Sequence, residues 1–208
     1  MNILHIDSGI LGEHSVSRQL TAAIVAGIKA ERPEDAIVYR DLAANPLAHL
    51  NGAQLMAGSA NPEGLDAALV SDLEAARLSL EDFLAADVVV IGAPMYNFTV
   101  PSQLKAWLDR ILVAGRTFRY TESGVEGLAK GKKVIVASTR GGHYSGASPI
   151  SAWDHQETYL QTVFGFIGIT DIEIVRAEGL AISPDSKEAA IRDAQAAIAG
   201  RRHFDIAA

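Results

Sequence analysis

The chain contains no cysteine among its 208 residues. This excludes disulfides, thiolate nucleophiles, cysteine-bound zinc and iron–sulfur clusters. Basic charge is also scarce, because 18 Lys and Arg stand against 25 Asp and Glu and give a formal net charge of −7. An acidic surface repels phosphate backbones, so we expect no nucleic-acid partner.

Long hydrophobic runs are missing as well. No apolar stretch approaches the roughly 20 residues of a membrane-spanning helix, and the first residues lack the basic and apolar segments of a secretion signal. We therefore expect a cytoplasmic protein with no membrane partner. Hydrophobic residues still make up 49% of the chain, which is typical of a globular protein and predicts a single domain over residues 1–208.

Several signatures of nucleotide and catalytic sites are absent. The chain has neither G-x-G-x-x-G nor G-x-x-x-x-G-K-[ST], which disfavours a Rossmann dinucleotide site and a P-loop ATPase. It also lacks the G-x-S-x-G turn of hydrolases, and its six His residues are scattered without metal-ligand spacing. We therefore expect no hydrolase nucleophile and no metal site.

Short apolar strands alternate with amphipathic helices along most of the chain. We predict strands at 3–7, 36–42, 87–92, 133–138 and 172–177, and helices at about 17–30, 63–85, from 101, 155–166 and 184–199. This order predicts an α/β fold, a flavodoxin-like doubly wound sheet of five parallel strands in the order 2-1-3-4-5. Residues 117–128 break the alternation and are expected to form a small hairpin insert.

The loop at residues 7–18 follows the first predicted strand and should lie at the carboxyl edge of the sheet, where open α/β sheets bind ligands. It offers the hydroxyls of Ser8, Ser15 and Ser17 and the amides that begin a helix, a combination that suits a phosphate. Arg18 can add positive charge. The alternative is that Ser15 or Ser17 only caps the helix.

Two further loops should reach the same edge. Residues 93–98 are aromatic and amide-rich, which suits a flat ring with a polar rim, such as a flavin; the alternative is that Tyr96 and Phe98 only cover the end of the sheet. In residues 138–144, Gly141 and Gly142 allow the backbone to approach a ligand closely. The three loops together favour a mononucleotide as the ligand.

With these loops in view, the chain resembles the FMN-dependent NADH azoreductases, also called FMN-dependent NADH:quinone oxidoreductases. The resemblance runs from Ile3 to about Ala199 and rests on residues 40–46, 93–98, 117–122, 139–142 and 165–169. It implies a homodimer with two FMN sites at the subunit interface. It implies FMN contacts by Ser8, Ser15, Val16, Ser17, Met95, Tyr96, Asn97, Phe98, Thr139, Arg140, Gly141 and Gly142. It also implies that Phe118 and Tyr120 wall the substrate pocket.

The function that the resemblance implies is ping-pong reduction by two-electron hydride transfer. NADH or NADPH reduces FMN and leaves, and a quinone or an azo compound then takes the electrons, the azo compound ending as amines. The flavin carries the chemistry, so we expect no catalytic side chain. The alternatives are a flavin reductase that supplies free reduced FMN, a flavodoxin-type electron carrier, and a flavin-binding regulator without turnover.

Two residues depart from the family pattern. Gly9 stands where a second Ser is frequent, and Val16 stands where a polar residue is common. We expect weaker side-chain contact with FMN and not its loss, because the Val16 amide is still a donor. The sequence leaves the choice between NADH and NADPH open, with Arg18, Arg119 and Arg140 as candidates to meet a 2′-phosphate.

Overall fold

The computed structural model describes residues 1–57 and 65–200. Its centre is a parallel sheet of five strands in the order β2-β1-β3-β6-β7. The strands are β1 (Asn2–Asp7), β2 (Ala36–Asp41), β3 (Val88–Pro94), β6 (Lys133–Thr139) and β7 (Asp171–Ala177). Counted within this sheet, the order is the predicted 2-1-3-4-5, and the flavodoxin-like fold is confirmed.

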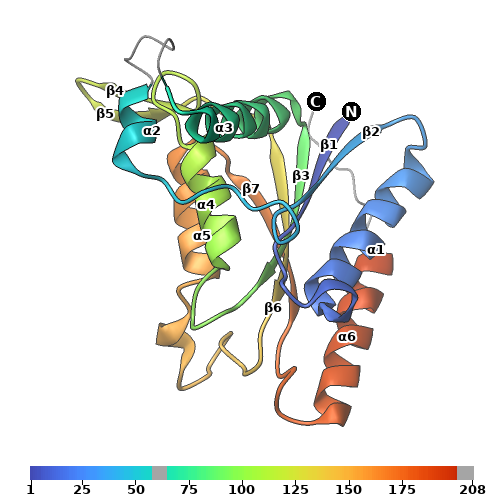
Figure 1. Cartoon of the computed structure of the whole chain (residues 1–208). Coiled ribbons are helices and arrows are strands. Elements are labelled where there is room, and N and C mark those ends of the chain that lie inside the picture. Colours follow the sequence, from blue (N-terminus) through green and yellow to red (C-terminus); the bar gives the residue numbers. More distant parts are fainter. Residues whose placement is uncertain (58–64, 201–208) are drawn as a thin grey trace.

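Helices cover both faces of the sheet (Figure 1). One face carries α1 (Val16–Glu31) and α6 (Pro184–Ala199), and the other carries α3 (Ala67–Ala85), α4 (Ser102–Ile111) and α5 (Glu157–Phe166). Each layer of helices buries its own apolar cluster against the sheet. Strand β3 is buried at every position, which explains its continuous apolar sequence.

The predicted hairpin is present as β4 (Phe118–Thr121) paired with β5 (Gly124–Gly127). It packs against the end of α5, where the Ala129 N–H donates to the Ile167 carbonyl (2.9 Å). A side chain at Gly127 would overlap the backbone of Gly168, so only glycine allows this close approach. Figure 1 shows the hairpin at the end of the sheet where the strands begin, opposite the loops that follow β1, β3 and β6.

The segment after β2 differs most from the sequence expectation. A short helix, α2 (Gly52–Ala57), was not predicted, and the helix expected from about residue 63 begins at Ala67. Asp66 caps that helix by accepting a hydrogen bond from the Ala68 N–H (3.4 Å). Residues 58–64 lie outside the described residues.

Two 3₁₀ turns complete the secondary structure of the described residues, η1 (Gly12–His14) before α1 and η2 (Ser151–Trp153) before α5. In residues 1–57 and 65–200, no helix is both long enough and apolar enough to cross a bilayer.

Candidate functional site

The loops after β1, β3 and β6 meet at the carboxyl edge of the sheet. The strand register aligns their starts, since Asp7 pairs with Gly92 on β3, and Thr139 of β6 pairs with the last residue of β3. The Met95 N–H donates to the Thr139 carbonyl (2.8 Å), and the Ile10 N–H donates to the Tyr96 hydroxyl (3.2 Å). These two hydrogen bonds connect all three loops.

A cavity of about 210 Å³ opens where the loops meet. It is lined by Leu11, His14, Ser15, Val16, Pro94, Met95, Tyr96, Thr139, Arg140, Gly141, Leu180, Ala181 and Lys187. Predicted residues from each of the three loops are therefore brought together. The other predicted loop residues, Ser8, Ser17, Asn97, Phe98 and Gly142, belong to the same loops but do not line the cavity.

Some lining residues were missed by the sequence analysis. Leu180 and Ala181 follow β7, and Lys187 lies on α6. These residues form no recognisable motif, but β7 is parallel to β6, so its following loop necessarily reaches the same edge. That topological rule, and not a residue pattern, is the signal that could have found them.

The start of α1 lacks a side-chain cap. Ser15 occupies the N-cap position, but its hydroxyl makes no capping bond and lies 3.0 Å from the Ser17 hydroxyl, with which it shares a hydrogen bond. Both residues are buried. The capping alternative is therefore wrong, and the first-turn amides of α1 retain their partial positive charge for an anion. The buried Ser8 hydroxyl is already used, since it donates to the Gly92 carbonyl (2.6 Å).

The loop after β3 contains a tight turn with unusual backbone angles. Asn97 and Phe98 have φ values of 48° and 73°, and reciprocal hydrogen bonds between Tyr96 and Thr99 close the turn. Bulky residues rarely adopt positive φ, and such strain is concentrated at functional sites. Phe98 is 46% exposed, and its ring contacts the Trp153 ring with 5.8 Å between the ring centroids.

The Arg140 guanidinium is not available to a ligand. Its side chain is completely buried and donates to the side chains of Gln156 (2.9 Å), Asp154 (2.9 Å) and Glu178 (3.1 Å). A third carboxylate, Glu157, lies 2.6 Å away. Only the backbone of Arg140 can therefore face the cavity.

This buried cluster also fixes the glycine loop after β6. Burial alone raises the pKa of the Glu178 carboxyl, but hydrogen bonds from the Ser145 hydroxyl and the Tyr144 amide, and the charge of Arg140, lower it overall. Glu178 is thus a charged anchor for residues 144–145.

The two aromatic residues of the hairpin are remote from this cavity within one chain. Phe118 is buried in the core against Phe166 (4.8 Å between ring centroids), and the Tyr120 side chain is 74% exposed. Neither lines the cavity, because the hairpin lies at the amino end of the sheet. Arg18 does not line it either, so the structure gives no support for a direct Arg18 contact with a phosphate.

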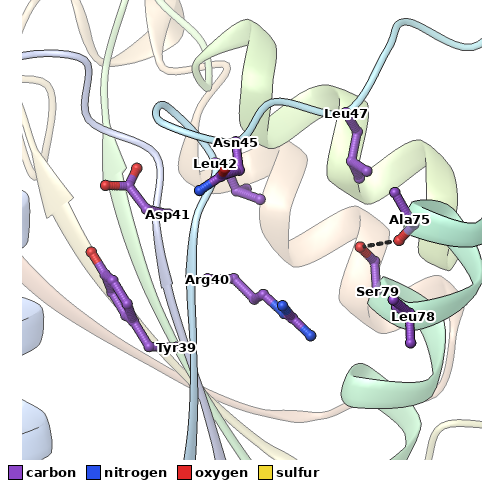
Figure 2. A pocket seen from close by; sticks show the side chains of 9 residues that line it. All are labelled: Tyr39, Arg40, Asp41, Leu42, Asn45, Leu47, Ala75, Leu78 and Ser79. Atoms are coloured by element: carbon purple, nitrogen blue, oxygen red, sulfur yellow. Dashed lines mark hydrogen bonds between the residues drawn. The ribbon is translucent and has the colours of Figure 1, made fainter. Parts of the chain in front are cut away.

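A second cavity, of about 200 Å³, lies between β2 and α3 (Figure 2). It is lined by Tyr39, Arg40, Asp41, Leu42, Asn45, Leu47, Ala75, Leu78 and Ser79. None of the predicted cofactor or substrate residues is among them. Figure 2 shows Arg40 directed toward α3, where its guanidinium pairs with Asp82 (2.5 Å).

Comparison with known proteins identifies the family of the chain. A family profile for the flavodoxin-like fold matches residues 1–201. The chain is 67% identical over 199 residues to an FMN-dependent NADH:quinone oxidoreductase of Sinorhizobium fredii and 68% identical over 199 residues to one of Rhizobium meliloti, and each match covers 96% of both chains. The chain belongs to the FMN-dependent NADH:quinone oxidoreductase family.

Solved structures of azoreductases share the fold of this family member. An azoreductase from Bacillus anthracis superimposes with a TM-score of 0.84 at 31% identity, over 96% of this chain and 97% of that chain. An FMN-dependent NADH-azoreductase from the same species, in complex with FMN, superimposes with a TM-score of 0.83 at 26% identity, over 96% and 98%. The family cofactor is FMN, and the uncapped α1 terminus together with the strained turn suits a ligand that has a phosphate and a flat ring.

Proposed function

We propose that this chain is an FMN-dependent NADH oxidoreductase that reduces quinones and cleaves azo compounds at the carboxyl-edge cavity. One observation carries the proposal: the uncapped start of α1 and the loop bearing the strained turn border the same cavity. A single ligand can therefore place its phosphate at the first and its ring at the second. The names of the most similar relatives support this activity.

The residues of the chain bind and orient the cofactor. Ser15, which lines the cavity and whose hydroxyl is bonded to that of Ser17, would hold the phosphate together with the first-turn amides of α1, and the helix dipole favours its negative charge. Met95 and the backbone at Gly141 line the cavity and would hold the ring and its polar rim. When bound, FMN supplies two-electron hydride chemistry, so the protein needs no acidic or basic side chain for the transfer.

The two substrates use one position in turn. With FMN bound, NADH and the quinone would occupy the same part of the cavity in turn, and the oxidised nicotinamide would leave before the quinone binds, which is the ping-pong order. An azo bond needs four electrons for cleavage to two amines, so an azo compound requires two such rounds.

We further propose that the active form is a homodimer in which the hairpin of one copy covers the cavity of the other. The hairpin exposes Tyr120 (74%), and the neighbouring α2 exposes Leu55 (68%) and Met56 (74%). Leu11, which lines the cavity, is 60% exposed in turn, and Trp153, which contacts the Phe98 ring of the loop after β3, is 53% exposed. Apolar surface of this kind marks association sites, and a two-fold axis would cover both ends of both copies at once.

NADH is the donor that the charge distribution favours. The three arginines that the sequence offered to a 2′-phosphate are all engaged: Arg18 with Asp41 (2.6 Å), Arg119 with Glu126 (2.7 Å), and Arg140 with its carboxylate cluster. Each of these three arginines therefore already has a carboxylate partner. We expect a higher kcat/KM with NADH than with NADPH in steady-state assays.

The deciding experiment is an anaerobic NADH titration of the FMN-loaded protein, followed by benzoquinone. We expect the flavin absorbance to bleach in one two-electron phase and to return when the quinone is added. A flavin that NADH cannot bleach, or that stops after one electron, would overturn the proposal in favour of a carrier or a regulator. Release of reduced FMN through a filter before quinone addition would instead indicate a flavin reductase.

A pair of variants links this activity to the cavity. Ser15→Ala removes a hydroxyl that lines the proposed phosphate site, and loss of a hydrogen bond to a charged group costs about 1.5–3 kcal/mol, so the Kd for FMN should rise by about 10- to 150-fold. Ser79→Ala removes a hydroxyl that bonds the Ala75 carbonyl (2.9 Å) beside the second cavity. That control should leave the Kd for FMN unchanged in a flavin fluorescence titration.

A further inference from the structure

Arg18 lies in the first turn of α1, next to the proposed phosphate site, but its guanidinium is fully used elsewhere. Its Nε and Nη2 atoms donate to the Gly9 carbonyl (3.1 and 3.0 Å). Its Nη1 and Nη2 atoms donate to the two carboxylate oxygens of Asp41 (2.6 and 2.7 Å). The planar fork thus holds a loop carbonyl from one side and the end of β2 from the other.

Further hydrogen bonds to Tyr39 and Asp7 hold the Arg18 side chain in this arrangement. Arg18 Nη1 donates to the Tyr39 hydroxyl (3.2 Å), and that hydroxyl donates to Asp7 Oδ2 (3.1 Å). The Thr21 hydroxyl donates to Asp7 Oδ1 (2.8 Å). Figure 2 shows Tyr39 and Asp41 on the side of β2 opposite to Arg40, as the two-residue period of a strand requires. The network therefore joins β1, α1 and β2.

The charges of the network make it a poor attractor of phosphate. The hydrogen bonds from Arg18 lower the pKa of Asp41 in spite of its partial burial. Burial raises the pKa of Asp7, but the nearby His5 ring and the Thr21 and Tyr39 hydroxyls lower it overall. Burial, together with the Asp7 charge, raises the pKa of Tyr39 to about 12. At neutral pH, two carboxylates and a neutral phenol therefore surround the single charge of Arg18.

The Gly9 carbonyl connects this network to the phosphate site. A Cβ atom at Gly9 would overlap the Ser15 hydroxyl and lie 3.2 Å from the Ser17 hydroxyl. The backbone at Gly9 therefore rests directly on the hydroxyl pair at the start of α1. Any shift of the Gly9 carbonyl changes where Ser15 and Ser17 point.

We propose that Arg18 is a positioning residue: held by Asp41, it clamps the Gly9 carbonyl and so fixes the hydroxyl pair that receives the FMN phosphate. It does not touch the phosphate. This inference rests on the proposed function. It means that the network around Arg18 makes the site bind FMN more tightly than riboflavin, which has the same ring and no phosphate.

The variant Asp41→Asn distinguishes a positioning role of Arg18 from direct attraction of the phosphate, because the two roles predict opposite changes in the Kd for FMN. If Arg18 attracted the phosphate directly, loss of the Asp41 charge would strengthen FMN binding. Positioning predicts the opposite, because the amide breaks the two-oxygen contact with the fork. We expect the Kd for FMN to rise about tenfold, in line with loss of one charge-assisted hydrogen bond, and the Kd for riboflavin to stay unchanged.

A second variant and a matched control use the same titration. Arg18→Lys keeps the positive charge but cannot form the fork, so it should lose the preference for FMN over riboflavin as Asp41→Asn does. The control is Arg40→Lys. Arg40 precedes Asp41 on β2, but its side chain lies on the opposite side of the strand and pairs with Asp82. This control should keep the wild-type preference.

The outcomes divide cleanly when the Kd values for FMN and riboflavin are measured by fluorescence on folded protein. A preference lost in both test variants and kept in the control supports the positioning role. Tighter FMN binding in Asp41→Asn, an unchanged preference in Arg18→Lys, or equal loss of both flavins would overturn it. The proposed function fails separately, if wild-type protein loaded with FMN does not reduce benzoquinone with NADH.

Discussion

Replacing Arg140 by methionine should destabilise the fold far more than the loss of an ordinary surface ion pair. In the wild type, the completely buried guanidinium faces three carboxylates, Asp154, Glu157 and Glu178, at 2.6–3.1 Å. Methionine fills similar space but supplies no charge and no donor. Three buried carboxylates would then lie close together with Arg176 as the remaining cation, which pairs with Glu157 (2.8 Å).

The size of the effect follows from this geometry. Removing one partner of a buried ion pair costs about 3–5 kcal/mol, because the other charge is left uncompensated. A domain of this size loses about 2–4 °C of melting temperature per kcal/mol. We therefore expect Arg140→Met to lower the Tm by about 6–20 °C at pH 7.

The pH dependence gives a second, independent check. The pKa of Glu178 is lowered in the wild type, so its carboxylate stabilises the fold above its ordinary pKa of 4.5, and this stabilisation is lost as the pH falls through the lowered value. In Arg140→Met the largest remaining influence on Glu178 is burial, which disfavours the charged form. As the pH falls, protonation of Glu178 in the variant then removes a buried charge that has lost its partner. The difference in Tm between the wild type and Arg140→Met should therefore become smaller between about pH 7 and pH 5.

The assay is thermal unfolding followed by circular dichroism on FMN-free protein, with Arg116→Met as control. Arg116 pairs with Glu81 at 2.8 Å, but both side chains are about half exposed (46% and 45%), and such pairs contribute below about 1 kcal/mol. Equal Tm losses in the two variants, or a difference that does not change with pH, would refute the reasoning.

Three further outcomes are expected. Asn97→Val places a β-branched residue at a φ of 48° and should lower the Tm by a few degrees, whereas Asn97→Gly should not; a lower Tm for the glycine variant would contradict this. Tyr120→Ala removes an exposed ring and should raise the KM for quinone while the Tm stays unchanged. An unchanged KM would show that the hairpin is not part of the site. Size-exclusion chromatography with light scattering should give a dimer for the wild type, and a monomer that turns over normally would contradict the shared site.

Much of the fold could be predicted because the sheet is buried on both faces. The apolar run in β3 and the amphipathic spacing of Leu20, Ile24 and Ile28 in α1 are direct consequences of burial, and the structure confirms both. The segment between β2 and α3 was predicted poorly. Its short helix α2 buries only Gln54, so no apolar period marks it in the sequence.

The predicted site divides in a similar way. It could be predicted that Ser15, Met95 and Gly141 come together, because loops that follow parallel strands share an edge, and the three residues line one cavity. The orientation of the arginines could not be predicted. Arg18 and Arg140 belong to the predicted site loops, but their partners Asp41 and Glu178 lie 23 and 38 residues away along the chain.

The sequence by itself determined the alternation of strands and helices, the sheet edge where the predicted site loops meet, and the family. These follow from local periodicity and from the chirality of parallel connections, which a linear pattern carries. Only the tertiary structure decided that the helix start at Ser15 is uncapped, that the arginines are engaged, and that the hairpin lies at the far end of its own chain from the cavity. The physical reason is that hydrogen bonds and ion pairs depend on distances between side chains distant in sequence, which only the packed fold sets.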